Sequence, residues 1–244
     1  MSRLAVIGGT GLNKLVDLTD VYKRVIKTPY GEPSSPLTFG KLNGVDLVFM
    51  ARHGFGHTIP PHRINYRANM WALREAGATD VLAIAAVGSI NRKMEPGALV
   101  LPHQLIDYTW GRESTYFEDD LEQVTHIDFT NPYSLKLRAE VRMAMVSADL
   151  SLLENAVYGC TQGPRLETAA EIKRLERDGC DLVGMTGMPE AALARELELD
   201  YACCAIVVNW AAGLDGDQIS MSEIERFAEK GMHQLDKLLK VFIK

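Results

Sequence analysis

Seven short runs of apolar, mostly β-branched residues alternate with helical patterns along this sequence. The apolar runs cover residues 4–7, 46–51, 81–87, 98–101, 156–160, 182–185 and 202–208. Most are continuously apolar, which is typical of strands that are covered on both faces. Helical patterns lie at residues 66–75, 134–147, 168–178, 189–196 and 222–242. Strands that alternate with helices predict an α/β fold, a three-layer sandwich around a mixed, mostly parallel central sheet.

Composition narrows the classes of function. The 244 residues contain no internal repeat, low-complexity tract or Ser/Gly/Pro linker, so we expect one domain over residues 1–244. With 26 basic and 32 acidic residues, the formal net charge is −6. This balance argues against a nucleic-acid binder, because affinity for nucleic acid backbones comes mainly from many Lys and Arg side chains. No apolar run reaches the roughly 20 residues that cross a bilayer, so no membrane span is expected.

The four cysteines indicate a reducing compartment. Cys160, Cys180, Cys203 and Cys204 lie within apolar stretches, and no Cys-x-x-Cys pair occurs. The sequence also begins with no recognisable export signal. We therefore expect reduced cysteines in the core of a cytoplasmic protein.

In parallel sheets, ligands bind beyond the carboxyl ends of the strands, so the residues after each run are the candidate site. The first run ends in Gly8-Gly9-Thr10-Gly11, which is either a phosphate cradle or a plain turn. The second ends in Arg52 and His53, which fit either a solvated loop or an anion site in which the arginine fork holds two phosphate oxygens. His53, His57 and His62 lack the spacing of a zinc hydrolase site, so no metal is expected.

Two later strand ends carry polar groups that need partners. Glu167 follows a Gly-Pro turn close to a helix start, where it either caps the helix or faces a ligand. Asn209 directly follows the apolar run 202–208, where a turn explains the amide as well as a ligand does. The small residues 85–89 at another strand end fit either tight packing or backbone contacts to a ligand.

Together these segments resemble the trimeric purine nucleoside phosphorylase and methylthioadenosine phosphorylase family, in the same order over nearly the whole chain. The matching motifs are Gly8-Gly9-Thr10-Gly11, Arg52-His53-Gly54, His57-Thr58-Ile59, residues 65–69 (Asn-Tyr-Arg-Ala-Asn), Gly163-Pro164-Arg165 and residues 185–190 (Met-Thr-Gly-Met-Pro-Glu). The stretch 57–69 is more similar to the methylthioadenosine branch. The resemblance implies phosphorolysis, in which inorganic phosphate attacks the anomeric carbon of a nucleoside and releases the free base and a sugar 1-phosphate.

The resemblance also implies roles for individual residues. The implied phosphate-binding residues are Thr10, Arg52, His53, Ala85, Ala86 and Thr186. The implied substrate contacts are Met185, Asn209, Trp210, Ala211 and His57. Asn209, Glu167 and His53 are the expected catalytic residues, and no metal or organic cofactor is required beside the co-substrate phosphate.

The base-recognition residues depart from the methylthioadenosine branch, whose enzymes carry aspartates at the positions of Asn209 and Ala211 and a serine at that of Glu167. An amide at Asn209 can donate to the 6-carbonyl of hypoxanthine or guanine and accept from N7. The Glu167 carboxylate can accept from N1. This pattern resembles the 6-oxopurine phosphorylases, and such sites reject the mismatched base by around ten-thousandfold.

The sugar end resembles the methylthio branch instead. Met221 and Ile224 match in position the apolar residues that receive a 5′-methylthio group, although Met221 also fits ordinary packing of the last helix. His233 could reach the pocket in place of the histidine that general nucleoside phosphorylases hold near the 5′-hydroxyl. With Glu167 and Asn209 as the other specificity residues, the combination predicts phosphorolysis of S-methyl-5′-thioinosine to hypoxanthine and 5-methylthioribose 1-phosphate.

Several alternatives stay open at this point. They are a general inosine and guanosine phosphorylase, a methylthioadenosine phosphorylase, and a nucleotide-binding module without catalysis. The resemblance further implies a homotrimer with sites near subunit interfaces, to which the long segment 109–130 is a candidate contributor. Roles for Asp215 and Asp217 are left open by the sequence.

Overall fold

The fold is built on one twisted sheet in a computed structural model that describes residues 3–9, 18–118, 123–215 and 219–243. In these residues the sheet has eleven strands. They are β1 (Leu4–Gly8), β2 (Thr19–Arg24), β3 (Leu37–Leu42), β4 (Val45–Ala51), β5 (Asp80–Ser89), β6 (Leu99–Leu101), β7 (Gln104–Asp107), β8 (Leu153–Glu154), β9 (Val157–Cys160), β10 (Leu182–Gly184) and β11 (Asp200–Trp210). The main path runs β2-β3-β4-β1-β5-β10-β9-β7, and β11 joins β5 to β6.

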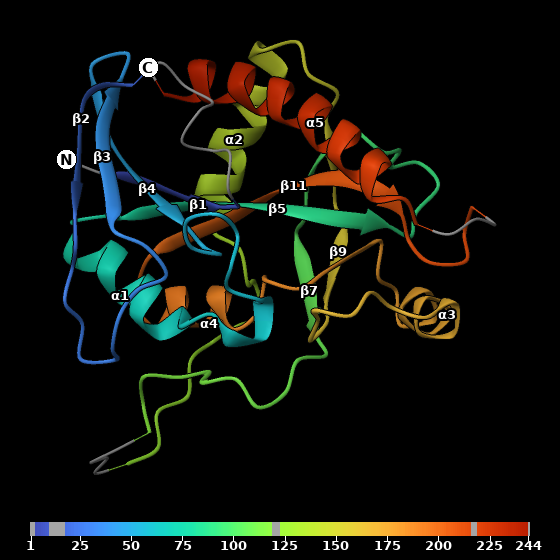
Figure 1. Cartoon of the computed structure of the whole chain (residues 1–244), viewed down its shortest axis with the longest axis horizontal. Helices are drawn as coiled ribbons and strands as arrows, with labels where there is room; N and C mark the ends of the chain where they lie inside the picture. Colours follow the sequence, from blue (N-terminus) through green and yellow to red (C-terminus); the bar gives the residue numbers. More distant parts are fainter. Residues whose placement is uncertain (1–2, 10–17, 119–122, 216–218, 244) are drawn as a thin grey trace.

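Helices cover both faces of this sheet, which confirms the predicted three-layer α/β fold. The helices are α1 (Tyr66–Glu75), α2 (Leu135–Ser147), α3 (Ala169–Arg177), α4 (Glu190–Glu196) and α5 (Met221–Phe242), with a short 3-10 helix at Pro61–Arg63. Figure 1 shows α2 and α5 on one side of the sheet and α1 and α4 on the other. Two large buried apolar clusters correspond to these two sides.

The predicted helices and the seven predicted strands all form, with bounds that differ by a few residues at most. The sequence analysis missed four strands, which are β2, β3, β7 and β8. β2 is exposed along its whole length, so its sequence carries no apolar signal. It pairs with β3 and β3 with β4, all antiparallel, at one edge of the sheet. β7 and β8 are short and only partly buried.

The parallel strands β1, β4, β5 and β11 place their carboxyl ends at the same edge of the sheet. Helix α5 lies close to this edge, because Gly231 packs directly on Ile206 of β11. A β-carbon at Gly231 would overlap the Ile206 side chain. The N-terminal half of α5 therefore stands beside the strand ends, where polar residues were predicted to gather.

All four cysteines are buried and none forms a disulfide. Across the described ranges, the helices include none that is long and apolar enough to span a bilayer.

Candidate active site

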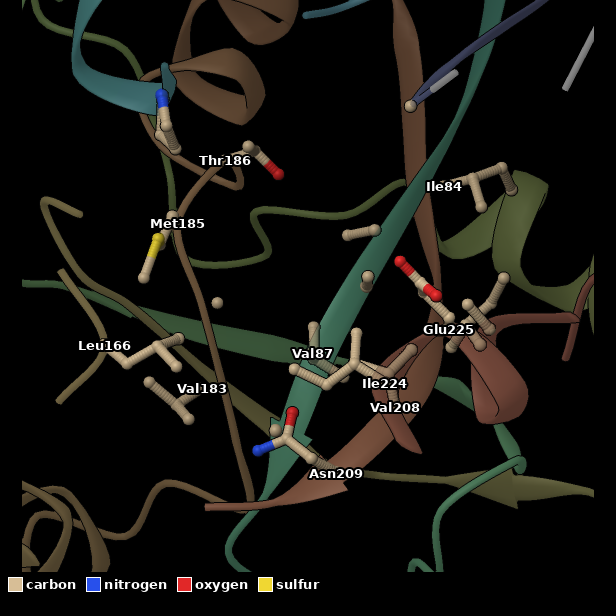
Figure 2. A pocket seen from close by; sticks show the side chains of 18 of the residues that line it. Ile84, Val87, Leu166, Val183, Met185, Thr186, Val208, Asn209, Ile224 and Glu225 are labelled. Carbon is tan, nitrogen blue, oxygen red and sulfur yellow. The ribbon is translucent and has the colours of Figure 1, made fainter. Parts of the chain in front are cut away.

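A cavity of about 980 Å³ lies between the strand ends and the N-terminal half of α5. This volume is within the range of sites for small organic ligands. Eleven predicted site residues line it, namely Arg52, His53, His57, Ala85, Ala86, Glu167, Met185, Thr186, Asn209, Ala211 and Ile224. Segments that are far apart in sequence thus meet at one place. In Figure 2, Thr186 and Asn209 lie toward opposite ends of the view, and Ile224 and Glu225 of α5 lie across from Met185.

Five residues named from the sequence are not among those that line the cavity. Trp210 lies outside it and stacks with the Arg92 guanidinium, 5.1 Å from the ring centroid. Met221 is 65% exposed at the start of α5 and is not among the lining residues, so its assignment to the 5′ pocket stays a prediction. Asp215 is exposed and lies away from the lining. Thr10 and Asp217 lie outside the described residues, whereas His233 lines the cavity.

Arg52 differs from the sequence-based expectation in both its exposure and its geometry. Its side chain is 2% exposed and forms a bidentate ion pair with Glu190, with Nε–Oε2 at 2.6 Å and Nη2–Oε1 at 2.7 Å. Its Nη1 donates to the carbonyl of Ile84 at 2.9 Å, and the second proton of Nη2 is donated to the carbonyl of Ile7 at 3.4 Å. The fork predicted to hold two phosphate oxygens is therefore already occupied by a carboxylate, and of the five N–H donors one on Nη1 is left for a ligand.

The charge of this buried pair is balanced within the protein. Burial by itself would lower the pKa of the Arg52 guanidinium, but the Glu190 carboxylate beside it raises that pKa above its ordinary value. Tyr201 donates its hydroxyl proton to Glu190 Oε1 at 2.9 Å. Glu190 is 0% exposed, so both charges are removed from water and each depends on the other.

His53 is held in one tautomer. Its Nδ1 lies 2.8 Å from the carbonyl of Ile59, so Nδ1 carries the proton that is donated and Nε2 is an acceptor. The ring stacks on His57 with centroids 4.3 Å apart. Burial, opposed in part by the bond to Ile59, lowers the pKa of His53 to about 4, with Arg52 and His57 acting in the same direction as burial.

We expect the His53 ring to titrate near pH 4 and to be neutral at pH 7. Because the pKa is lower in the folded than in the unfolded chain, the ring's contribution to stability is complete above about pH 6.5 and is lost toward pH 4. An NMR titration of the histidine ring protons checks this, and assignment by a His53→Gln variant identifies the signal. A His53 midpoint near 6.5 would contradict the prediction.

A β-bulge explains why Asn209, and not Trp210, faces the cavity. Along β11 and β5, Ile206 pairs with Ala86 and Val207 with Val87, but the register then shifts and Asn209 pairs with Gly88. Paired residues share a face of the sheet. The extra residue in β11 therefore places Asn209 on the same face as Ala86, and it places Trp210 on the opposite face together with Ser89. Bulges are frequent beside functional sites because they redirect a side chain in this way.

Gly88 makes room for the Asn209 amide. A β-carbon at Gly88 would lie 3.3 Å from Asn209 Nδ2 and 3.2 Å from Cγ1 of Val183. Nδ2 donates one proton to the carbonyl of Trp210 at 2.7 Å, which leaves its second proton and the amide oxygen for a ligand.

Glu167 does not cap the helix that follows it. Thr168 is the N-cap of α3 and forms a capping box with Glu171. Glu167 accepts instead from the Thr161 hydroxyl, with Oγ1–Oε1 at 2.6 Å. One carboxylate oxygen is thereby fixed, and the carboxylate lines the same cavity as Asn209.

Helix α5 contributes four lining residues that the sequence analysis missed, namely Glu225, Ala228, Glu229 and Met232. Ile224, Ala228 and Met232 follow one another at intervals of four, and so do Glu225, Glu229 and His233, and all six line the cavity. Spacing by four places residues on one side of a helix, so the predicted helix 222–242 already contained this signal. The first stripe is apolar, and the second is charged or polar and exposed.

Among the described residues, no group of three or more His, Cys, Asp or Glu side chains is arranged to hold a metal ion.

Comparisons with known proteins agree with this geometry. A model of the phosphorylase superfamily matches residues 3–244. A probable S-methyl-5′-thioinosine phosphorylase of Pseudomonas syringae pv. tomato is 54% identical over 239 residues, which cover 98% of this chain and 97% of the relative. The 6-oxopurine nucleoside phosphorylase of Pyrococcus furiosus is 44% identical over 246 residues, with coverage of 98% and 91%. A crystal structure of a methylthioadenosine phosphorylase from an antarctic soil metagenomic library superposes with a TM-score of 0.93 at 34% identity, over 99% of this chain and 85% of that one.

Proposed function

Because this chain belongs to the phosphorylase superfamily, we propose that it is a pentosyltransferase that cleaves S-methyl-5′-thioinosine with inorganic phosphate. The products are hypoxanthine and 5-methylthioribose 1-phosphate, and the role is purine salvage. The observation that carries the proposal is that an amide, Asn209, and a carboxylate, Glu167, line the same cavity as Arg52, His53 and Thr186. The first two fit a 6-oxopurine and the last three fit phosphate.

At the base end, each polar group keeps capacity for a ligand. Glu167 has one oxygen bound to Thr161, and its other oxygen can accept the N1 proton of hypoxanthine. Asn209 can donate its second Nδ2 proton to O6 and accept a proton on N7 with its oxygen. Adenine offers an acceptor at N1, which would face the Glu167 carboxylate without a proton between them. Sites built on such hydrogen bonds discriminate by about ten-thousandfold.

At the phosphate end, one hydrogen-bond donor is the neutral Thr186 hydroxyl, and the other is the Arg52 guanidinium, whose positive charge is paired with Glu190. The Thr186 hydroxyl and the remaining Nη1 proton of Arg52 can donate to phosphate oxygens. His53 accepts at Nε2, which suits the protonated oxygen of hydrogen phosphate. This arrangement selects the protonation state of the nucleophile and orients it toward the sugar.

The reaction is then driven by positioning and electrostatics. As the glycosidic bond breaks, positive charge develops on the sugar and negative charge on the purine. Hydrogen bonds from Asn209 to the leaving base are stronger in that state than in the bound substrate, so they lower the barrier. In this proposal phosphate itself is the nucleophile, and no metal or organic cofactor takes part in the step.

A second candidate is a general 6-oxopurine nucleoside phosphorylase. It is favoured by the polar stripe Glu225, Glu229 and His233 on α5, which lines the cavity beside the apolar stripe. These side chains could hydrogen-bond a 5′-hydroxyl. We place the methylthio substrate first because Ile224, Ala228 and Met232 pack against the buried apolar cluster and offer sulfur an apolar surface.

We also propose a homotrimer in the cytoplasm. The exposed Trp110, at 72%, lies in the segment that follows β7 and offers apolar surface for a subunit contact. The four unpaired cysteines suit a reducing compartment. Sedimentation equilibrium measures the assembly, and a monomer would reject the trimer.

The proposed activity is tested by following hypoxanthine release from S-methyl-5′-thioinosine with and without phosphate. We expect release only with phosphate and one 5-methylthioribose 1-phosphate for each hypoxanthine. Release without phosphate would indicate a hydrolase, and binding without release would indicate a nucleotide-binding module.

A further inference from the structure

We propose that Arg112 is a positioning residue that fixes the two segments carrying the sugar, phosphate and base contacts of the site. This inference rests on the proposed function. Arg112 lies in the long segment between β7 and α2, and it is absent from the cavity lining. It therefore acts through other residues and touches no substrate.

The guanidinium of Arg112 binds backbone carbonyls from two separate strand ends. Its Nη1 donates to the carbonyl of Met185 at 3.0 Å and to that of Met188 at 2.5 Å. Its Nη2 donates to the carbonyl of Gln162 at 2.9 Å and to that of Thr161 at 3.3 Å. Four carbonyls after β9 and β10 thus converge on one side chain. Such convergence requires the planar fork of arginine.

Two further contacts hold the guanidinium itself. The Gln162 side-chain oxygen accepts from Nε at 3.1 Å, and the Tyr66 hydroxyl accepts from Nη1 at 3.2 Å. The Tyr66 ring also lies 5.4 Å below the guanidinium carbon. Tyr66 begins α1, so Arg112 ties the two strand ends to a helix in the layer beneath them.

The segments that Arg112 holds are those that carry the proposed chemistry. Arg112 binds the carbonyls of Met185 and Met188, and the segment that they delimit includes Met185 and Thr186, which line the cavity. Thr161 holds the Glu167 carboxylate through its hydroxyl. One side chain outside the cavity thereby fixes the contacts to phosphate and sugar on one segment and to the base on the other.

The amides of the 185–188 turn are held weakly from the other side. Thr186 N donates to the Tyr158 hydroxyl at 3.4 Å, and Met188 N donates to the Cys160 sulfur at 3.2 Å. Neutral hydroxyl and sulfur acceptors bind more weakly than charge-assisted partners. Without Arg112 we therefore expect this turn to move, and a displacement of about 1 Å costs on the order of a hundredfold in rate.

The test compares Arg112→Ala with Arg138→Ala. Arg138 of α2 also donates to two backbone carbonyls, those of Pro102 and Leu101, but neither of these two residues lines the cavity. We expect Arg112→Ala to lower kcat/KM about a hundredfold, and added guanidinium, far below denaturing concentration, to restore part of it. Arg138→Ala should keep the wild-type kcat/KM and show no response to guanidinium.

A second readout does not depend on catalysis. Hydrogen exchange at residues 161–163 and 185–188 should be faster in Arg112→Ala than in wild type and Arg138→Ala. Unchanged exchange there, or a kcat/KM equal to that of Arg138→Ala, would overturn the role of Arg112. An inactive wild-type protein would instead reject the proposed function and leave the exchange comparison decisive for Arg112.

If Arg112→Ala does not fold, Arg112→Lys replaces it, because lysine keeps the charge but cannot bind four carbonyls as a fork. A loss of kcat/KM in a folded Arg112→Lys variant supports the role. A wild-type kcat/KM in that variant overturns it.

Discussion

Glu190→Gln should destabilise the protein by about 3–5 kcal/mol, because it leaves the buried Arg52 charge without its partner. The Glu190 carboxylate is 0% exposed and accepts two hydrogen bonds from Arg52 and one from Tyr201. A glutamine amide would set its own donors against those of the guanidinium. Equilibrium unfolding in urea measures the loss as a lower transition midpoint.

The matched control is Glu113→Gln. Glu113 also pairs with an arginine, Arg67, but its side chain is 67% exposed. Exposed pairs contribute about 0–1 kcal/mol, so the control should stay close to wild type. Equal losses in the two variants would contradict the view that the Arg52–Glu190 pair is buried and dry.

Asn209→Asp should lower kcat/KM for S-methyl-5′-thioinosine by about a hundred- to a thousandfold, the usual effect of removing one donor to developing negative charge. The substitution removes the Nδ2 donor to O6 of the purine and adds a second carboxylate to the cavity that Glu167 lines. A keto purine then meets acceptors only. Cleavage of S-methyl-5′-thioadenosine should rise relative to cleavage of S-methyl-5′-thioinosine, since a carboxylate can accept from the 6-amino group of adenine.

Asn209→Leu separates a polar from a steric effect. Leucine has the same branched shape and number of heavy atoms as asparagine but no hydrogen-bonding group, so both nucleosides should be cleaved poorly and the ratio of their kcat/KM values should not reverse. An unchanged selectivity in Asn209→Asp would show that Asn209 does not read the base.

The strands and helices that surround the site were accessible from the sequence because buried parallel strands are continuously apolar. The exposed edge strand β2 was not, since its residues Thr19–Arg24 contact solvent along their length. The same physics explains why the site could be located: polar residues that follow apolar runs, such as Asn209 and Arg52, gather at one edge of the sheet.

What the sequence could not supply was the direction of individual side chains. The arginine fork of Arg52 is used by Glu190, 138 residues away, and no local pattern reveals such a pair. The bulge that separates Asn209 from Trp210 is a shift of one residue in strand register, which the apolar run does not record. Met221 and Ile224 were assigned together to the 5′ pocket from their positions in the family resemblance, but of the two only Ile224 lines the cavity.

The most direct test of the account is the ratio of kcat/KM for S-methyl-5′-thioinosine to that for S-methyl-5′-thioadenosine, measured on the wild-type protein in saturating phosphate, with inosine as a third substrate. If Glu167 and Asn209 read a 6-oxopurine, methylthioinosine is preferred over methylthioadenosine by about ten-thousandfold. If the apolar stripe of α5 receives the 5′ group, methylthioinosine also exceeds inosine. A preference for methylthioadenosine would contradict the claim that Glu167 and Asn209 recognise a 6-oxopurine.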